Sequence, residues 1–211
     1  GVMDEDVFWS CTTCRACMEV CPVGIEHVDL IMDVRRSQAL MEGNIPAEAQ
    51  SSLRAIETRG NPFGPADSRI AWAEGLEVPI LGAGDEVEIL YWVGCISAYD
   101  KRKQKIARSM VQILNASGLK WGILGNKESC TGDPARRLGE ENLFQNSAKK
   151  NIELLKSIRF TTVVANCPHC FNTLKNEYPD VGSFAEGREL RVVHHSHLIQ
   201  ELIANGRLAL Q

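Results

Sequence analysis

The sequence predicts an α/β protein in which a small helical segment precedes a larger unit built on a parallel sheet. From residue 87 onward, short apolar runs of strand length alternate with amphipathic stretches of helix length. Such alternation is typical of parallel strands whose crossover helices cover the sheet. Before residue 61 the chain has helical patterns and a dense cysteine run. We therefore expect three parts: residues 1–60, a connector at 61–86, and the α/β unit at 87–211.

The composition is that of a folded globular protein. The chain has 211 residues, of which 44% are hydrophobic and 24% charged, enough apolar material for one core and a small appendage. The net charge of −4, without a run of Lys or Arg, argues against a nucleic-acid surface. No apolar run has the length of a transmembrane helix, and the acidic residues 1–10 do not resemble a signal peptide. Clustered cysteines without a secretory signal predict metal ligands in a reducing compartment, the cytoplasm.

The helical segment opens with four cysteines spaced C-x2-C-x2-C-x3-C-P. They are Cys11, Cys14, Cys17 and Cys21, and Pro22 follows. Bacterial ferredoxins hold [4Fe–4S] clusters with this spacing. Two residues between thiolates let one short loop present three sulfurs to one cube, and the fourth cysteine, before the proline, usually serves a second cluster. A zinc knuckle also uses C-x2-C spacing, but three evenly spaced thiols with C-P favour the cluster.

The run is one ligand short for its own cluster. The cluster at Cys11, Cys14 and Cys17 needs a fourth thiolate from a partner run upstream, which would in turn take Cys21 as a ligand. Only ten residues precede Cys11, and none is a cysteine. We therefore expect residues 1–60 to be half of a ferredoxin-like module and the chain to be a piece of a longer polypeptide.

Two helices are expected after the cysteine run. Residues 25–42 lack glycine and proline and place apolar residues on one side, which predicts a helix. We assign His27, Arg35 and Arg36 to the solvated face of this helix. Pro46 starts a second helix that ends near Gly60. The connector that follows, at 61–86, is rich in glycine and proline and is expected to lie on the surface, anchored by Trp72.

The α/β unit contains four predicted strands and four predicted helices. The strands are expected at 87–93, 121–124, 160–165 and 190–193. The helices are expected at 101–116, 135–158, from 167 to about 178, and around 198–203. Because strands and helices alternate, the strands are expected to form one parallel sheet.

The other four cysteines follow the ends of predicted strands. Cys95 follows the first strand, and Cys130 lies in the loop after the second. Cys167 follows the third strand, and Cys170 lies in the first turn of the next helix. Parallel strands bring these loops to the carboxyl edge of the sheet, where open α/β sheets bind ligands, and helix amino termini there lower thiol pKa values. The four thiols therefore predict one metal site.

The segments around these cysteines carry a family resemblance. They read GCISAYD at 94–100, SCTGDPARRLGEENLFQ at 129–145, ANCPHCFNTLKNEYPD at 165–180 and VVHHSHLIQELIANGRL at 192–208, after WSCTTCRACMEVCPVGIEHVD at 9–29. Together they resemble the cysteine-rich CCG domain of heterodisulfide reductases and related iron–sulfur oxidoreductases, over nearly the whole chain. The resemblance is strongest to membrane-associated iron–sulfur proteins thought to carry electrons from electron-transfer flavoprotein to a quinone. It implies a parent chain with a membrane domain, a two-cluster ferredoxin module and two CCG domains, of which this sequence spans the second ferredoxin half and the first CCG domain.

The sequence departs from the family pattern at Thr131. The family has two adjacent cysteines there, which in the heterodisulfide reductase catalytic subunit help to build a non-cubane double cluster, whereas here Thr131 follows Cys130. Four thiolates remain instead of five, enough for one [4Fe–4S] cube or one tetrahedral zinc. Electron relay or a structural zinc is therefore favoured over thiol–disulfide catalysis, and the choice between cluster and zinc stays open.

Four histidines lie near the predicted carboxyl edge. His194, His195 and His197 follow the fourth strand, where they either modulate the metal centre or cap the last helix. His169 stands between two ligand cysteines and is expected beside the centre rather than among its ligands.

The helix predicted at 135–158 begins with charged residues. Asp133, before a proline, is expected at its N-cap or at the N′ position before the cap. Arg136 and Arg137 lie in its first turn, where positive charge opposes the helix dipole, so an anionic partner is expected nearby, and a cluster with four thiolates is the candidate. The chain has no glycine-rich phosphate loop, so no nucleotide or flavin is expected on it.

These features predict the iron–sulfur electron-transfer portion of an oxidoreductase, without a catalytic acid or base of its own. One [4Fe–4S] cluster is assigned to the first four cysteines, and a cluster or zinc to the other four. The implied partners are a redox protein of the electron-transfer flavoprotein type, a second acceptor such as a quinone, and the rest of the parent chain. The parent chain would also supply attachment to the inner face of the cell membrane. The alternatives are a structural zinc-binding docking domain and heterodisulfide reductase-type thiol–disulfide catalysis.

Overall fold

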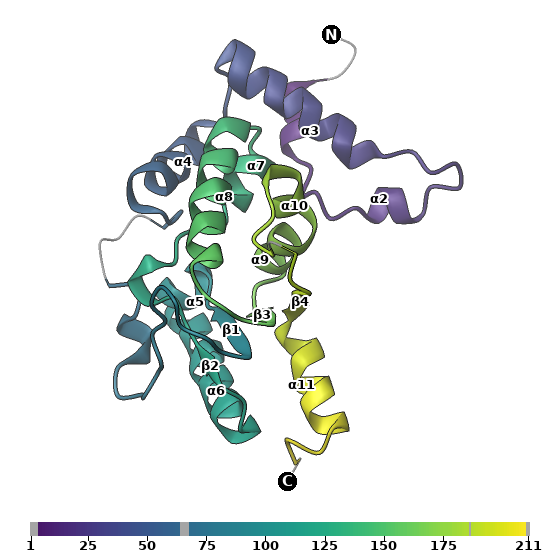
Figure 1. Cartoon of the computed structure of the whole chain (residues 1–211). Helices are drawn as coiled ribbons and strands as arrows, with labels where there is room; N and C mark the ends of the chain where they lie inside the picture. The colour runs from purple at the N-terminus through teal and green to yellow at the C-terminus, as the bar shows by residue number, and fades with distance from the viewer. Residues whose placement is uncertain (1–3, 64–67, 186, 210–211) are drawn as a thin grey trace.

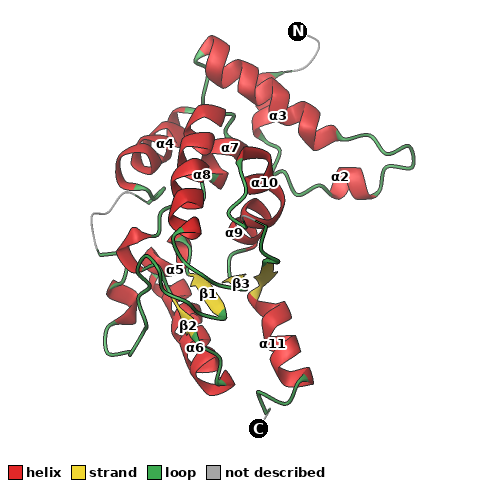
Figure 2. Cartoon of the chain, in the orientation of Figure 1, coloured by secondary structure: helices red, strands yellow, loops and turns green. Residues whose placement is uncertain are grey.

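A four-stranded parallel sheet lies at the centre of the computed structural model, which describes residues 4–63, 68–185 and 187–209 (Figures 1 and 2). The strands are β1 Ile89–Trp92, β2 Trp121–Gly122, β3 Thr162–Ala165 and β4 Arg191–His194. Their order across the sheet is β2-β1-β3-β4, and every pairing is parallel. The predicted α/β class and the four predicted strands are confirmed, each within a few residues.

Alternate residues of the strands build two apolar cores, one on each face of the sheet. On one face Leu90 and Trp92 pack in a cluster with residues of α8, which spans Glu141–Lys156. On the other face Ile89 and Tyr91 pack with residues of α6, which spans Lys101–Ser117. Because both faces are covered, all four residues of β1 are buried, as expected for a strand at the centre of a parallel sheet.

The N-terminal segment is helical, as predicted. It contains α1 Glu5–Trp9, α2 Ala16–Glu19, α3 His27–Ser37 with a π-helical turn at Gln38–Glu42, and α4 Ala47–Arg59. Helix α4 ends at Gly60, whose φ of +67° suits the left-handed position after a helix. The predicted helices at 25–42 and 46–60 are therefore confirmed, while α1 and α2 had no sequence signal that we recognised.

The predicted helix at 135–158 is wrong in one respect, because two helices occupy this stretch. Helix α7 spans Asp133–Arg137, and α8 begins at Glu141. Gly139 lies between them with a φ of +80°, and a Cβ atom there would lie 2.4 Å from the carbonyl oxygen of Arg35. The helix breaks at this point because the backbone of α3 crosses directly over it.

We expect Gly139→Ala to lower the free energy of unfolding by about 2 to 3 kcal/mol. About 1 to 2 kcal/mol comes from the left-handed backbone, and the rest from the clash with the Arg35 carbonyl. Gly84→Ala is the matched control, because Gly84 has a φ of +86° but no atom within 4 Å of the added Cβ. Denaturant unfolding measures both variants, and equal losses would show that the α3 crossing does not cause the break.

The remaining helices follow the strands. They are α5 Cys95–Tyr99, α9 Pro168–Asn172, α10 Tyr178–Val181 and α11 His195–Ala204, with a π-helical turn at Thr173–Glu177 between α9 and α10. Helix α5 was not predicted, because five residues are too few for a periodic pattern. Helix α11 packs against α6 in the second core.

The connector contributes buried residues as well as surface. Trp72 is buried in the same core as α6, so its predicted anchoring role is confirmed. Ile80 forms a parallel bridge with Ile123, which extends the pairing at the edge of the two-residue strand β2. In the described part of the chain, no helix has both the length and the apolar character needed to cross a membrane.

Candidate metal centre

The structure places the second set of cysteines at the carboxyl edge of the sheet, as predicted. Cys95 is the first residue of α5, directly after β1, and Cys130 lies in the loop before α7. Cys167 is the residue directly before α9, after β3, and Cys170 lies within α9. All eight cysteines lie within the described residues and are free thiols.

The four thiols interact as two pairs. Cys95 and Cys130 shift each other's pKa, and so do Cys167 and Cys170. The pKa of Cys170 also responds to the charges of Cys95 and Cys130, so the two pairs are neighbours. Among the described residues, no three Cys, His, Asp or Glu side chains form a ready-made site for a single metal ion.

Each pair favours one thiolate. The hydrogen bond from Cys130 lowers the pKa of Cys95 against the cost of burial, and the charge of Arg69 lowers it further. The hydrogen bond from Cys170 and nearby backbone N–H groups lower the pKa of Cys167 to about 6, although burial opposes them. The hydrogen-bonded partners, Cys130 and Cys170, have pKa values well above the usual range. The edge therefore supports anionic sulfur, which is the form that binds metals.

Gly94 leaves room for the sulfurs. Its φ is +77°, and a Cβ atom there would lie 3.3 Å from the sulfur of Cys170 and 3.8 Å from the Cβ of Cys167. Three of the four cysteines are buried, and Cys167 is half-buried. Four clustered thiols, largely screened from water, fit the donor set of an iron–sulfur cluster or of zinc.

A buried ion pair that the sequence did not reveal lies beside Cys95. Both terminal nitrogens of Arg69 lie 3.5 Å from the Cys95 sulfur. Arg69 Nη2 also donates to Glu128 Oε1 at 2.6 Å, and both side chains are almost fully buried. We missed this pair because Arg69 lies in the connector, 26 residues before the cysteine it contacts.

The first set of cysteines lies in the loop around α2, at the edge of the molecule away from the sheet (Figure 1). Cys14 and Cys17 are exposed, and Cys11 and Cys21 are half-buried. Backbone N–H groups point at sulfur here too: Thr13 donates to Cys11 and Ile25 donates to Cys21, each at 3.4 Å. Such donors lower the pKa values of Cys14 and Cys21. The loop therefore also favours thiolates.

The first cysteine loop and the start of α9 line a shared pocket. A cavity of about 420 Å³ is lined on one side by the loop that contains Cys14 and on the other by Asp133 and by Pro168 and His169 of α9. Residues 168 and 169 lie between the ligand candidates Cys167 and Cys170. The first cysteine loop thus packs near the second set, with this cavity between them.

The expectation that Arg35 lies on a solvated face is wrong. Arg35 is buried, and its guanidinium donates hydrogen bonds to the carbonyl oxygens of Phe8 and Cys11, at 2.5 and 2.6 Å, and of Arg137 in α7, at 2.8 Å. It also lies over the ring of Trp9, 5.3 Å from its centroid. This one side chain fixes the start of the cysteine loop to the α/β unit.

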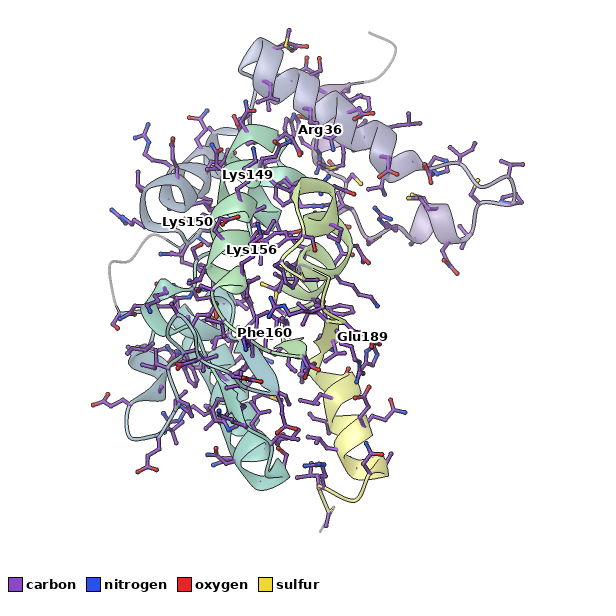
Figure 3. The ribbon with its side chains drawn as sticks, viewed as in Figure 1. Arg36, Lys149, Lys150, Lys156, Phe160 and Glu189 are labelled. Carbon is purple, nitrogen blue, oxygen red and sulfur yellow. The ribbon has the colours of Figure 1, made fainter. Side chains whose placement is uncertain are left out.

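The neighbours of Arg35 on α3 are not fully solvated either. His27 is half-buried. Arg36, labelled in Figure 3, is half-buried. It pairs with Asp33 and lies 3.4 Å from Glu141 at the start of α8. Helix α3 is therefore held against the α/β unit by Arg36 as well as by Arg35.

Glu177 is the anion that the Arg136-Arg137 pair was expected to require. It accepts hydrogen bonds from Arg136, at 3.2 Å, and from Arg137. Asp133 is not the expected amino-terminal cap, because Gly132 occupies that position and no side chain caps the helix. Instead Asp133 is buried and bonds His169 Nδ1 at 3.0 Å, which raises the pKa of His169.

The histidines after β4 gather around an aromatic ring of α9. The rings of His194 and His197 lie 6.0 and 6.4 Å from the ring of Phe171. His194 is the residue before α11, and its Nδ1 lies 2.8 Å from the hydroxyl of Ser196. Burial lowers the pKa of His195. These contacts support the helix-terminal role rather than the metal-modulating one.

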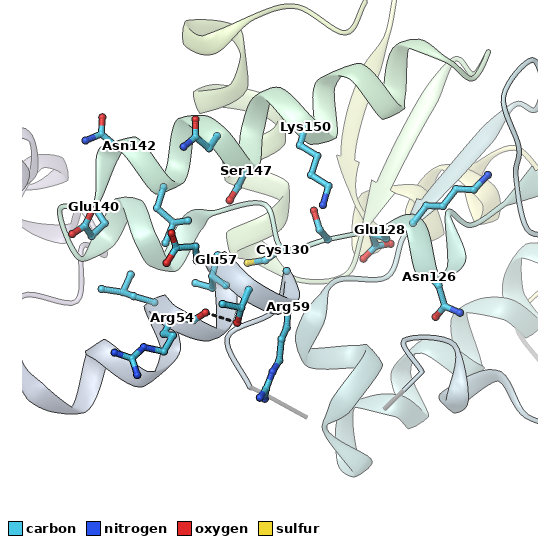
Figure 4. A pocket seen from close by; sticks show the side chains of 18 residues that line it. Arg54, Glu57, Arg59, Asn126, Glu128, Cys130, Glu140, Asn142, Ser147 and Lys150 are labelled. Carbon is cyan, nitrogen blue, oxygen red and sulfur yellow. Dashed lines mark hydrogen bonds between the residues drawn. The ribbon is translucent and has the colours of Figure 1, made fainter. Parts of the chain in front are cut away.

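A second pocket reaches Cys130 of the second cysteine set. It has a volume of about 790 Å³ and lies between α4 and α8, with Cys130 in its lining (Figure 4). The backbone N–H of Cys130 donates to the carbonyl of Gly60 at 2.6 Å, which ties the end of α4 to this cysteine. Arg54, Arg59 and Lys150 contribute positive charge to the walls, and Glu57 and Glu140 contribute negative charge.

The chain is similar to a known domain family and to several known proteins. The family model described as the cysteine-rich domain, CCG, matches residues 89–175. Over 98% of its length the chain is 44% identical to the probable iron-sulfur-binding oxidoreductase FadF of Bacillus subtilis, of which it covers 30%. It is 36% identical, again over 98% of its length, to the EtfAB:quinone oxidoreductase of Syntrophomonas wolfei, of which it covers 29%.

A more distant relative is one of the subunits of the dihydromethanophenazine:CoB–CoM heterodisulfide reductase of Methanosarcina barkeri. The identity is 29% over 94% of this chain and 48% of the relative. No solved structure matches the chain. The chain thus spans about a third of the first two relatives and half of the third. Residues 89–175 are a cysteine-rich CCG domain, and the chain is a homologue of iron–sulfur oxidoreductases that include an EtfAB:quinone oxidoreductase and a heterodisulfide reductase.

Proposed function

We propose that the chain is the iron–sulfur electron-transfer portion of an oxidoreductase, which relays electrons between a flavoprotein and a second acceptor such as a quinone. The observation that carries this proposal is the meeting of four largely buried thiols from three loops at one sheet edge, beside a buried arginine. The names of the relatives support this proposal, because one is called iron-sulfur-binding and another an EtfAB:quinone oxidoreductase.

The proposed ligands form two sets. Cys11, Cys14, Cys17 and Cys21 serve [4Fe–4S] clusters in a half-ferredoxin segment at residues 1–60. The second set, Cys95, Cys130, Cys167 and Cys170, holds one [4Fe–4S] cluster or one zinc ion within residues 87–211. A bound cluster supplies one-electron chemistry. The chain contributes the thiolates, the buried surroundings and the N–H groups directed at sulfur, such as those of Thr13 and Ile25.

The proposed partners are a redox protein of the electron-transfer flavoprotein type and the rest of the parent chain. We place the chain in the cytoplasm, with attachment to the inner face of the membrane supplied by the parent chain. The quinone in the name of the Syntrophomonas relative supports the proposed attachment to a membrane, because quinones reside in membranes.

Metal and sulfide content after anaerobic purification tests the proposal. We expect iron and acid-labile sulfide in equal amounts, with an EPR signal after reduction by dithionite. Cys170→Ser is expected to remove the iron and sulfide of the second set and to leave those of the first, while Cys14→Ser does the reverse. Arg102→Ala is the control, because Arg102 is an exposed residue of α6 outside both cysteine sets, and this variant is expected to keep all of its iron and sulfide.

Zinc without sulfide at the second set would contradict the relay and support the alternative, a structural docking domain. The same four thiols suit tetrahedral zinc, with sulfur about 2.3 Å from the metal. Reduction of a mixed disulfide by the isolated chain would instead support thiol–disulfide catalysis, which Thr131 disfavours because it replaces the second cysteine of the family pattern.

A further inference from the structure

Arg69 lies outside the cysteine motifs but contacts a sulfur of the second cysteine set. It belongs to the connector, before the residues that the family model matches. Its guanidinium is buried, and Nη1 and Nη2 both lie 3.5 Å from the sulfur of Cys95. Two N–H groups of one cation therefore converge on one ligand sulfur, a geometry that the planar fork of arginine permits and a lysine cannot copy.

Glu128 fixes the orientation of this guanidinium. Its carboxylate accepts a hydrogen bond from Arg69 Nη2 at 2.6 Å and two more from the backbone N–H groups of Val93 and Gly94, at 3.0 and 2.8 Å. The same side chain thus holds both Arg69 and the backbone directly before Cys95. A buried arginine alone would be costly, so the carboxylate also offsets the cost of burying the positive charge.

We propose that Arg69 is a positioning residue that sets the reduction potential of the centre at Cys95, by donating two N–H groups to the Cys95 sulfur, with Glu128 holding it in place. The proposal rests on the proposed function, because it requires an iron–sulfur centre at the second set of cysteines. It adds a residue of the connector to a site otherwise built from the α/β unit.

The sign of the effect follows from charge. One electron added to the centre makes its sulfur ligands more negative, and N–H groups directed at sulfur stabilise the reduced form more than the oxidised form. Loss of the two donors therefore lowers the reduction potential. A tenfold loss in the preference for the reduced form corresponds to about 59 mV for one electron, and we expect a shift of at least this size.

The test is an anaerobic redox titration of the full chain, followed by EPR, after iron and sulfide have been measured. Arg69→Gln is expected to keep its iron and to have a lower midpoint potential. Arg69→Lys retains the charge without the fork and is expected to shift the potential in the same direction by a smaller amount. Glu128→Gln keeps one side-chain oxygen that can accept from Arg69 but removes the opposing negative charge, and it is therefore expected to shift the potential upward.

Arg108→Gln is the matched control. Arg108 also holds the connector, through the carbonyl oxygens of Trp72 and Glu74 at 2.7 and 3.0 Å, and these acceptors are oxygens rather than sulfur. Loosening of the connector alone would shift the potential of Arg108→Gln as much as that of Arg69→Gln, and this outcome would overturn the proposal. An unchanged potential in Arg69→Gln would also overturn it.

The failure of this proposal and the failure of the proposed function give different results. If wild-type protein contains no iron and sulfide at the second set, both the proposed function and this inference are wrong. If wild-type protein has a redox-active centre there, but substitution of Arg69 does not change its reduction potential, only this inference is wrong. If Arg69→Gln loses its iron, Arg69→Lys becomes the test. A reduction potential equal to that of the wild type in Arg69→Lys would then overturn the proposal.

Discussion

Replacing Arg35 with alanine will detach the first cysteine loop from the α/β unit and lower the free energy of unfolding by roughly 3 to 5 kcal/mol. The substitution removes charge-assisted hydrogen bonds to the carbonyls of Phe8, Cys11 and Arg137, each worth about 1.5 to 3 kcal/mol before water replaces part of the loss. It also removes the contact with the Trp9 ring. Thermal or denaturant unfolding measures the loss, and hydrogen exchange measures the protection of residues 8–15.

Arg102→Ala is the control for this result as well, because its exposed side chain should cost less than about 0.5 kcal/mol to remove. Arg35→Lys keeps a positive charge but not the planar donors, so we expect an intermediate loss. Unchanged protection of residues 8–15 in Arg35→Ala would show that other contacts hold the loop.

Removal of the Glu128 side chain is expected to have a comparable effect. Glu128→Ala leaves the Arg69 cation buried without its carboxylate and leaves the N–H groups of Val93 and Gly94 without their acceptor. Breaking one side of a buried ion pair costs roughly 3 to 5 kcal/mol, since the remaining charge is uncompensated. Denaturant unfolding in the absence of added metal measures the cost without interference from the centre.

The matched control is Glu201→Ala, which breaks an ion pair of the same chemistry at the surface. Glu201 pairs with Arg191 at 2.5 Å, but these side chains are 41% and 53% exposed, against 1% and 6% for Glu128 and Arg69. Surface pairs contribute about 0 to 1 kcal/mol. If both variants lost the same free energy of unfolding, burial would not explain the contribution of the Arg69–Glu128 pair to stability.

Strands and long helices could be predicted because their signal lies in neighbouring residues. The run from Val87 to Val93 is mostly apolar, and β1 forms within it at Ile89–Trp92. Parallel alternation then placed Cys95 and Cys167 at one edge, since both follow closely after strand ends. This part of the candidate site required only the order of the elements along the chain.

The missed features depend on contacts between residues far apart in the chain. The break at Gly139 is caused by a backbone 104 positions earlier, at Arg35, and an amphipathic pattern continues through the break. Arg35 and Arg69 were not recognised because an arginine among polar neighbours has the same local pattern whether it is solvated or buried. Their burial depends on carbonyls and carboxylates supplied by other segments.

The attachment of the first cysteine loop also has a consequence for synthesis. Arg35 donates to the carbonyl of Arg137, which lies 102 residues later in the chain. At about 5 to 20 residues per second, the ribosome needs roughly 5 to 20 seconds to make that partner after it has made Arg35. During this interval the segment of α7 that binds Arg35 does not yet exist, so the loop cannot pack against it. The order of synthesis therefore leaves a period of seconds in which cellular assembly factors can reach the thiols of the loop.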